Sequence, residues 1–263
     1  MGGTGNRALQ QTGRAGILPG MAILDSWTPG QHTAGGVTHP TYRKGAGPGV
    51  IVIHEIPGLT PTVVGFAQEV VDAGFTVVLP HLFGTPGAPM SAGAIAKVLP
   101  RLCVSKEFTT MATGRTSPVA VWLRGLARSL HEELGGPGVG ALGMCFTGGF
   151  ALAMMVDPAV AAPVLAQPSL PFPVGRARAA DLNLSPSDLG AVKDRAAAGC
   201  EVLGLRYAGD RAVGTRFETL SRELGDAFLR VDLEGKGHST LTEHRSQEAV
   251  DRVLGFFRDK LRH

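Results

Sequence analysis

The sequence predicts an α/β fold in which helices cover both faces of a mostly parallel central sheet. From Gly49 onward, short apolar runs alternate with longer amphipathic runs. This alternation is typical of parallel strands joined by crossover helices. The chain has 263 residues, a length that suits one large α/β domain. We therefore expect residues 21–263 to form a single domain and residues 1–20, rich in Gly, Gln and Arg, to be a disordered extension.

Each predicted strand is a short run of aliphatic and β-branched residues between turn-forming residues. The predicted parallel strands cover residues 50–54, 75–79, 139–142, 161–166, 202–207 and 228–231, and residues 37–43 are predicted as an antiparallel edge strand. Loops at the carboxyl ends of parallel strands usually build the functional site. Residues 84–117 and 167–186 are predicted as loop regions of this kind.

Several predicted helices follow a recognisable start signal. A hydroxyl caps a free N–H group and proline suits the first turn, as in Thr60 before Pro61 and Ser117 before Pro118. The predicted helices cover residues 61–73, 118–134, 146–156, 187–198, 213–224 and 243–261, the fifth of them just downstream of Asp210.

The composition argues against several classes of partner. The formal net charge is +3, but no cluster of Lys and Arg is interleaved with aromatic residues, so we expect no nucleic-acid partner. No apolar run is long enough for a signal peptide or a membrane span, so we expect no membrane association. Cys103, Cys145 and Cys200 have no paired spacing and suit a reducing compartment. We therefore expect a cytoplasmic protein, and a monomer and a homodimer both stay open.

The most informative segment is the run GALGMCFTGG at residues 140–149, in which an apolar strand breaks into a turn and then a helix. This is the layout of a nucleophile elbow, with Cys145 where the usual pattern has serine. Gly143 removes a Cβ that would collide at the turn, and Gly148 with Gly149 allows the helix to pack closely. The amide of Phe146 would point into the same space as the thiol and form half of an oxyanion hole.

A cysteine nucleophile needs a base and a carboxylate that orients the base. Asp210 closes the apolar run LRYAGD, and His238 lies in the glycine-rich loop EGKGHS after the last predicted strand. An Asp in a turn or a His in a loop has an ordinary structural explanation when taken alone. The two together, in the order nucleophile, acid, histidine, follow the order of α/β-hydrolases. The sequence therefore predicts an α/β-hydrolase fold with a Cys145, Asp210 and His238 triad.

A second segment, VIVIHEIPG at residues 50–58, is a buried strand that ends in an acid. Glu55 would lie at the mouth of the sheet, where it could approach the thiol and hold or accept its proton. The amide of Ile56 would be the second oxyanion donor.

These segments together resemble the dienelactone hydrolase family. The resemblance covers residues 37 to the end and rests on HEIPG at 54–58, GMCFTGG at 143–149, AGD at 208–210 and GHS at 237–239. It implies a Cys-His-Asp hydrolase that cleaves a small-molecule ester or lactone through an acyl-thiol intermediate, without a cofactor. It also implies that the Glu, at position 55 here, helps to form the thiolate when substrate arrives.

The sequence departs from this family where the substrate is bound. The enzymes that act on dienelactone use arginines shortly after the strand that here ends in PHLFG and a few residues past the histidine. Here His81 occupies the first region and STLT follows His238. The natural substrate is therefore expected to differ from dienelactone. His81 and Arg115 are the candidate substrate-binding residues, and the insertion at residues 91–117 is long enough to reshape the pocket.

Two other signals are set aside. Gly138–Gly143 matches a dinucleotide fingerprint, but its glycines lie within the predicted strand, so no nucleotide is expected. The histidines show no metal-ligand spacing, so no metal is expected. Two alternatives stay open for the site itself: thioester hydrolysis or acyl transfer on the same triad, and a non-catalytic thiol that senses oxidants or holds a ligand.

Overall fold

The computed structural model describes residues 21–108 and 111–262. In this part of the chain, eight strands form one sheet in the order β1-β2-β4-β3-β5-β6-β7-β8. β2 pairs antiparallel with both β1 and β4, and the remaining neighbours are parallel. The strands are β1 Thr28–Ala34, β2 Val37–Lys44, β3 Gly49–Ile53, β4 Thr76–Pro80, β5 Val139–Met144, β6 Val160–Ala166, β7 Val202–Tyr207 and β8 Phe228–Leu233.

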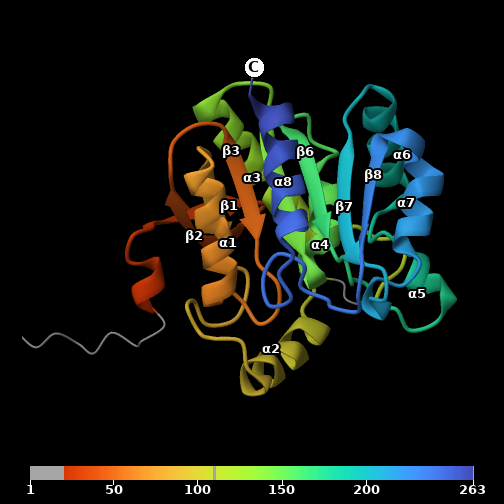
Figure 1. The fold of residues 1–263 in the computed structure, drawn as a ribbon, viewed down its shortest axis with the longest axis horizontal. Coiled ribbons are helices and arrows are strands. Elements are labelled where there is room, and N and C mark those ends of the chain that lie inside the picture. Colours follow the sequence, from red (N-terminus) through yellow and green to blue (C-terminus); the bar gives the residue numbers. More distant parts are fainter. Residues whose placement is uncertain (1–20, 109–110, 263) are drawn as a thin grey trace, which may run out of the picture.

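Helices cover both faces of this sheet (Figure 1). They are α1 Pro61–Asp72, α2 Ala92–Val104, α3 Pro118–Leu134, α4 Gly148–Met154, α5 Arg176–Ala180, α6 Pro186–Ala197, α7 Arg216–Leu224 and α8 Gln247–Leu261. No helix among the described residues is both long enough and apolar enough to cross a membrane.

Side chains alternate between two cores along the central strand β3. Ile51 and Ile53 pack with residues of α3, α4, α6 and α7, whereas Val50 and Val52 pack with residues of α1 and α8. The two-residue period of a strand produces this alternation. All residues of β3 are buried, as expected for a strand with helices on both sides.

The predicted parallel strands are confirmed as β3 to β8, with ends shifted by no more than two residues. The expected antiparallel strand is confirmed as β2, but it is not at the edge, because β1 pairs with its outer side. The polar run TPGQHTA of β1 is mostly exposed and shows no apolar alternation. Nothing in this segment therefore signals a strand to sequence analysis.

Three predicted helices begin or end elsewhere. The helix expected at 146–156 is divided into a 3-10 turn, η2 Cys145–Thr147, followed by α4. Asp210 caps a separate 3-10 turn, η3 Arg211–Val213, and α7 starts only at Arg216 because Gly214 ends that turn with a φ of 62°. α8 starts at Gln247, four residues later than expected, with Ser246 as its cap.

Both regions expected as loops contain helices, α2 within 84–117 and α5 within 167–186. Ser91 caps α2 by accepting a hydrogen bond from the Ala94 amide, and Val98 and Leu102 are buried on one side of the helix. Pro100 lies inside α2, and an interior proline normally argues against a helix. Figure 1 shows α2 at the carboxyl end of the parallel strands.

Candidate active site

The turn after β5 presents the Cys145 side chain at the carboxyl end of the sheet. Cys145 has a φ of 53°, a left-handed conformation that costs free energy in a non-glycine residue and often marks a functional site. Gly143 permits this turn, because a Cβ there would lie 2.2 Å from the Thr147 carbonyl oxygen. Gly148 lets α4 approach the loop after β6, because its Cβ would lie 2.6 Å from the Cα of Pro168. The predicted elbow is present.

The buried Thr147 hydroxyl ties this elbow to the end of β3. It accepts a hydrogen bond from the Met144 amide at 3.1 Å. It also lies 3.0 to 3.2 Å from the carbonyl oxygens of Met144, Ile53 and His54, to which it donates its one hydrogen. The elbow and the segment after β3 therefore hold a fixed relative position.

Asp210 and His238 meet at the same end of the sheet. The Asp210 carboxylate accepts a hydrogen bond from His238 Nδ1 at 2.7 Å through one oxygen, and from the Ala212 amide at 2.9 Å through the other. The Asp210 side chain is only 5% exposed and the His238 side chain 27%. A buried carboxylate that accepts two hydrogen bonds in this way fixes the orientation and tautomer of an imidazole.

Glycines allow the two loops that carry this pair to touch. A Cβ at Gly209 would lie 2.8 Å from the Gly235 carbonyl oxygen, and the Gly209 amide donates a hydrogen bond to that oxygen. A Cβ at Gly237 would lie 2.7 Å from the Tyr207 ring. Gly209 and Gly237, which precede Asp210 and His238, therefore allow close packing that a side chain would prevent.

His238 also interacts with Cys145. Burial lowers the pKa of His238, but its hydrogen bond with Asp210 and its interactions with Asp210 and Cys145 outweigh burial and raise this pKa to about 10. The imidazole is therefore held as a cation beside the Asp210 carboxylate. A thiolate beside an imidazolium is the reactive form of a nucleophilic cysteine.

Glu55 lies in the site region but contacts other partners than the sequence suggested. Its carboxylate oxygens accept hydrogen bonds from the Ser239 hydroxyl at 2.9 Å and from the Thr242 hydroxyl. Within the described residues it makes no hydrogen bond to Cys145. Burial raises the pKa of Glu55, and the bonds from Thr242 and Ser239 and the charge of His238 only partly oppose this rise. Glu55 therefore holds the loop that carries His238.

The two predicted oxyanion donors, Ile56 and Phe146, lie in the segment after β3 and in η2. Phe146 is the second residue of η2, whose first amides have no acceptor within the turn. Ile56 follows the segment that Thr147 holds against the elbow, and within the described residues its amide has no hydrogen-bond partner.

The two predicted substrate-binding residues are not brought to the triad. His81 packs beside His54 with 6.1 Å between ring centroids, and burial lowers the pKa of His81. Arg115 is exposed, and its segment is held on another loop, where the Gly114 amide donates to Asp181 at 2.7 Å. Neither residue contacts Cys145 or His238 within the part of the chain that the structure describes.

An apolar wall lies next to Cys145 instead. The Phe146 ring makes contacts with four other phenylalanines, at centroid distances of 5.7 Å for Phe83, 5.5 Å for Phe108, and 6.2 Å for Phe150 and Phe172. A hollow of about 340 Å³ beneath α2 is lined by Phe83 and Phe108 among others, and a second of about 450 Å³ is lined by Pro57 and residues of α2. α2, which the sequence did not predict, thus covers the space beside the site.

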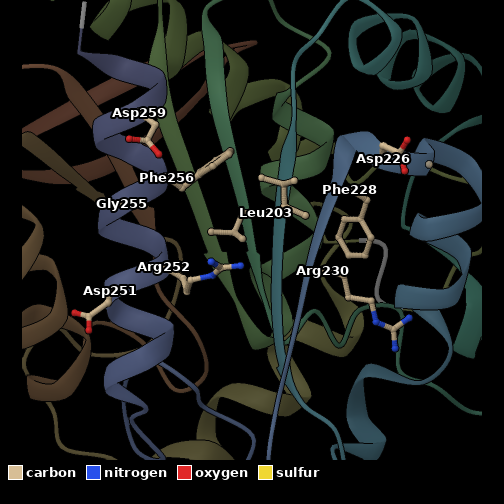
Figure 2. Close-up of a pocket in the computed structure, with 11 residues that line it drawn as sticks. Leu203, Asp226, Phe228, Arg230, Asp251, Arg252, Gly255, Phe256 and Asp259 are labelled. Atoms are coloured by element: carbon tan, nitrogen blue, oxygen red, sulfur yellow. The ribbon is translucent and has the colours of Figure 1, made fainter.

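A groove of about 630 Å³ lies far from these residues, between α8 and β8 (Figure 2). It is lined by Leu203 and Phe228, which lie near the starts of β7 and β8, and by Arg252 of α8. The starts of parallel strands are at the opposite end of the sheet from the elbow. Because sites of this architecture form at the carboxyl ends, we do not assign the reaction to this groove.

Three residues near the triad were missed by sequence analysis, Ser169 beside Cys145 and Ser239 and Thr242 on Glu55. Serine and threonine in loops are too common to be singled out without the fold. Within the described residues, no group of three or more His, Cys, Asp or Glu side chains is arranged to hold a metal ion.

The order of these groups along the chain defines the class of protein. The elbow follows β5, the acid follows β7 and the histidine follows β8 of a mixed sheet covered on both faces, which is the arrangement of an α/β-hydrolase. A family model described as the dienelactone hydrolase family matches residues 35–183, more than half of the chain. The chain belongs to the dienelactone hydrolase family. The match includes Glu55 and Cys145 and ends before Asp210 and His238.

Solved structures show the same fold at low sequence identity. The dienelactone hydrolase from Anabaena variabilis is 18% identical with a TM-score of 0.62, and the match covers 90% of this chain and 98% of that one. A dienelactone hydrolase-like promiscuous phosphotriesterase from metagenomic libraries is 17% identical with a TM-score of 0.62, covering 90% and 99%. A thioesterase domain from the curacin biosynthetic pathway is 12% identical with a TM-score of 0.53, covering 88% and 100%. No curated protein matches the chain.

Proposed function

We propose that this chain hydrolyses a carboxylic ester or a lactone with Cys145 as the nucleophile, His238 as the proton carrier and Asp210 as the group that orients His238. The observation that carries the proposal is the position of the imidazole. It bonds Asp210 through Nδ1 at 2.7 Å and also interacts with Cys145. Membership of the dienelactone hydrolase family supports the reaction class.

In the proposed first half-reaction, the Cys145 thiolate attacks the substrate carbonyl carbon and the carbonyl oxygen becomes an oxyanion. The amides of Phe146 and Ile56 donate hydrogen bonds to that oxyanion. Loss of one such donor typically costs about a hundred- to a thousandfold in rate. The imidazolium of His238 then gives its proton to the leaving alkoxide, which leaves as an alcohol, or as a hydroxyl on the same molecule when the substrate is a lactone.

In the second half-reaction, neutral His238 takes a proton from water as the water attacks the acyl-thiol carbonyl. The carbon–sulfur bond breaks, the carboxylic acid leaves, and the thiolate and imidazolium pair is restored. Asp210 stabilises the imidazolium in both halves. The apolar wall of Phe83, Phe108 and Phe172 beside Phe146 favours an apolar acyl group.

The test is hydrolysis of a short activated ester, p-nitrophenyl acetate, by wild type and Cys145→Ala over many turnovers. We expect at least about a thousandfold loss in Cys145→Ala, because the covalent route is removed. Cys103→Ala and Cys200→Ala are matched controls, since neither thiol contacts the triad, and both should retain activity. Activity that survives Cys145→Ala would contradict the proposal.

The alternatives separate in the same assay with intact-mass detection of the acyl-enzyme. A thioesterase would turn over acyl thioesters faster than the ester. An acyltransferase would accumulate one acyl group on Cys145 until an acceptor other than water is added. A sensing or ligand-holding thiol would react once with an oxidant or electrophile and show no turnover with either ester class.

A further inference from the structure

Ser169 makes two contacts with the nucleophile residue from the loop after β6. Its amide donates a hydrogen bond to the Cys145 carbonyl oxygen at 2.9 Å, and its hydroxyl oxygen lies 3.5 Å from the Cys145 sulfur. Ser169 is 4% exposed. Within the described residues its hydroxyl has no other hydrogen-bond partner. The hydroxyl is therefore directed at the sulfur and not shared with a structural contact.

The loop that carries Ser169 is held on both sides. Before it, the Gln167 side-chain oxygen accepts hydrogen bonds from the amide and hydroxyl of Thr240, at 3.3 and 2.7 Å. Thr240 is two residues beyond His238, so this loop contacts the loops of both the nucleophile and the base. Pro168 packs against Gly148 at the start of α4. The hydroxyl is thus preorganised before any substrate binds.

The direction of the hydrogen bond depends on the state of the sulfur. When Cys145 is a thiol, either the sulfur or the oxygen can donate. When Cys145 is a thiolate, the sulfur has no hydrogen, so only Ser169 can donate. A hydrogen bond to an anion is stronger than one between neutral groups. Once the sulfur is acylated it is a poor acceptor, so the bond favours the thiolate over both the thiol and the acyl-thiol.

We infer that Ser169 is a further catalytic residue of this site, whose hydroxyl donates a hydrogen bond to the Cys145 thiolate and increases its share over the thiol. The inference rests on the proposed function of Cys145. His238 supplies the charged partner of the sulfur, and Ser169 supplies a neutral one from a different loop. The same bond assists the thiolate as leaving group when water resolves the acyl-thiol.

The test measures how the rate of Cys145 alkylation by iodoacetamide depends on pH, in wild type and Ser169→Ala. Ser169→Ala keeps the amide bond to Cys145 and removes only the hydroxyl. We expect its profile to move to higher pH and its rate at neutral pH to fall about tenfold, the size of one hydrogen bond to a charged group. Modification is followed on the Cys145 peptide by mass, because Cys103 is exposed and will also react.

Two further variants separate chemistry from packing. Ser169→Thr restores a hydroxyl and should restore the wild-type profile. Thr76→Val removes a buried hydroxyl at the far end of β4, where it donates to the Gly47 carbonyl oxygen at 2.8 Å. Thr76→Val should leave the alkylation profile unchanged, even if it lowers the melting temperature of the protein.

Two results would overturn the role of Ser169: profiles of wild type and Ser169→Ala that superimpose, or a shift that Ser169→Thr does not reverse. Ester hydrolysis by Cys145→Ala distinguishes a failure of this inference from a failure of the proposed function. If that variant is inactive while the profiles superimpose, only the inference about Ser169 fails. If that variant remains active, the proposed function fails.

Discussion

At the scale of single residues, Glu55 has an unusual environment for a carboxyl group. It is 1% exposed, and its hydrogen bonds come from the neutral hydroxyls of Ser239 and Thr242. Burial of a carboxylate without a bonded cation favours its protonated form. His238 and Glu243 are the charged groups whose fields act on it, with opposite signs. Glu55 therefore links the end of β3 to the loop of His238. The free-energy cost of burying Glu55 depends on whether its carboxyl group is ionised.

This environment predicts how stability depends on pH. The pKa of Glu55 in the folded chain is raised above its ordinary value of 4.5, so its contribution to stability is fully present below that value. The contribution is lost as pH rises toward the folded pKa. Glu55→Gln cannot ionise, so it should be more stable than wild type at pH 7 and differ little at pH 4.

Thermal unfolding of both forms across that pH range is the measurement, in which each kcal/mol corresponds to about 2–4 °C. Glu243→Gln is the control, because Glu243 is an exposed acid on the same loop and should leave the pH dependence largely intact. A Glu55→Gln variant that follows the wild-type pH dependence would show that Glu55 is not the group responsible.

At the scale of elements, the elbow requires close packing where β5, η2 and α4 meet. Gly143 and Gly148 approach backbone atoms closely, but the nearest atom to a Cβ on Gly149 would be 3.6 Å away, an ordinary contact. The sequence suggested a packing role for Gly148 and Gly149 alike, and only Gly148 has one. Two glycines of one motif therefore differ in how they tolerate a side chain.

This contrast makes a matched pair of variants. Gly143→Ala should abolish ester hydrolysis and lower the free energy of unfolding by about 1–3 kcal/mol or more, because its Cβ meets the Thr147 backbone. Gly149→Ala should fold with equal or slightly higher stability, because alanine is favoured over glycine within a helix. Urea denaturation and ester hydrolysis of both variants are the measurements. Equal behaviour of the pair would contradict the role assigned to Gly143.

At the scale of the whole molecule, sequence analysis predicted what depends on local pattern. The parallel strands and the positions of Cys145, Asp210 and His238 at strand ends follow from apolar runs, glycines and chain order. β1 and α2 could not be predicted, because β1 is exposed and polar and α2 contains Pro100. The partners of Glu55 could not be predicted either. They depend on how two loops about 185 residues apart in the chain meet. The residue pattern within either loop does not indicate that contact.

Arg216 in α7 is a buried side chain that contacts several segments near Asp210. It is 1% exposed and donates hydrogen bonds to five backbone carbonyl oxygens, those of Pro171, Arg178, Asp181, Ala212 and Val213. These oxygens belong to the loop after β6, to α5 with its end, and to η3 beside Asp210. Burial lowers the pKa of Arg216 to about 10, with Asp181 opposing this effect. One guanidinium therefore holds together three segments around Asp210.

Removal of this guanidinium should loosen all three segments at once. Arg216→Met keeps much of the apolar stem but leaves buried carbonyl oxygens without donors, each at a cost of about 1–3 kcal/mol. We expect the free energy of unfolding to fall by roughly 3 kcal/mol or more. We also expect faster proteolysis in residues 171–181 and reduced ester hydrolysis, because η3 no longer holds Asp210 firmly.

Arg222→Met is the matched control in the same helix, since Arg222 is 66% exposed and its ion pair among the described residues is with Glu223 alone. If urea denaturation gives equal stability for the two variants, the carbonyl contacts of Arg216 contribute no more than a surface ion pair, and another contact must hold the segments around Asp210.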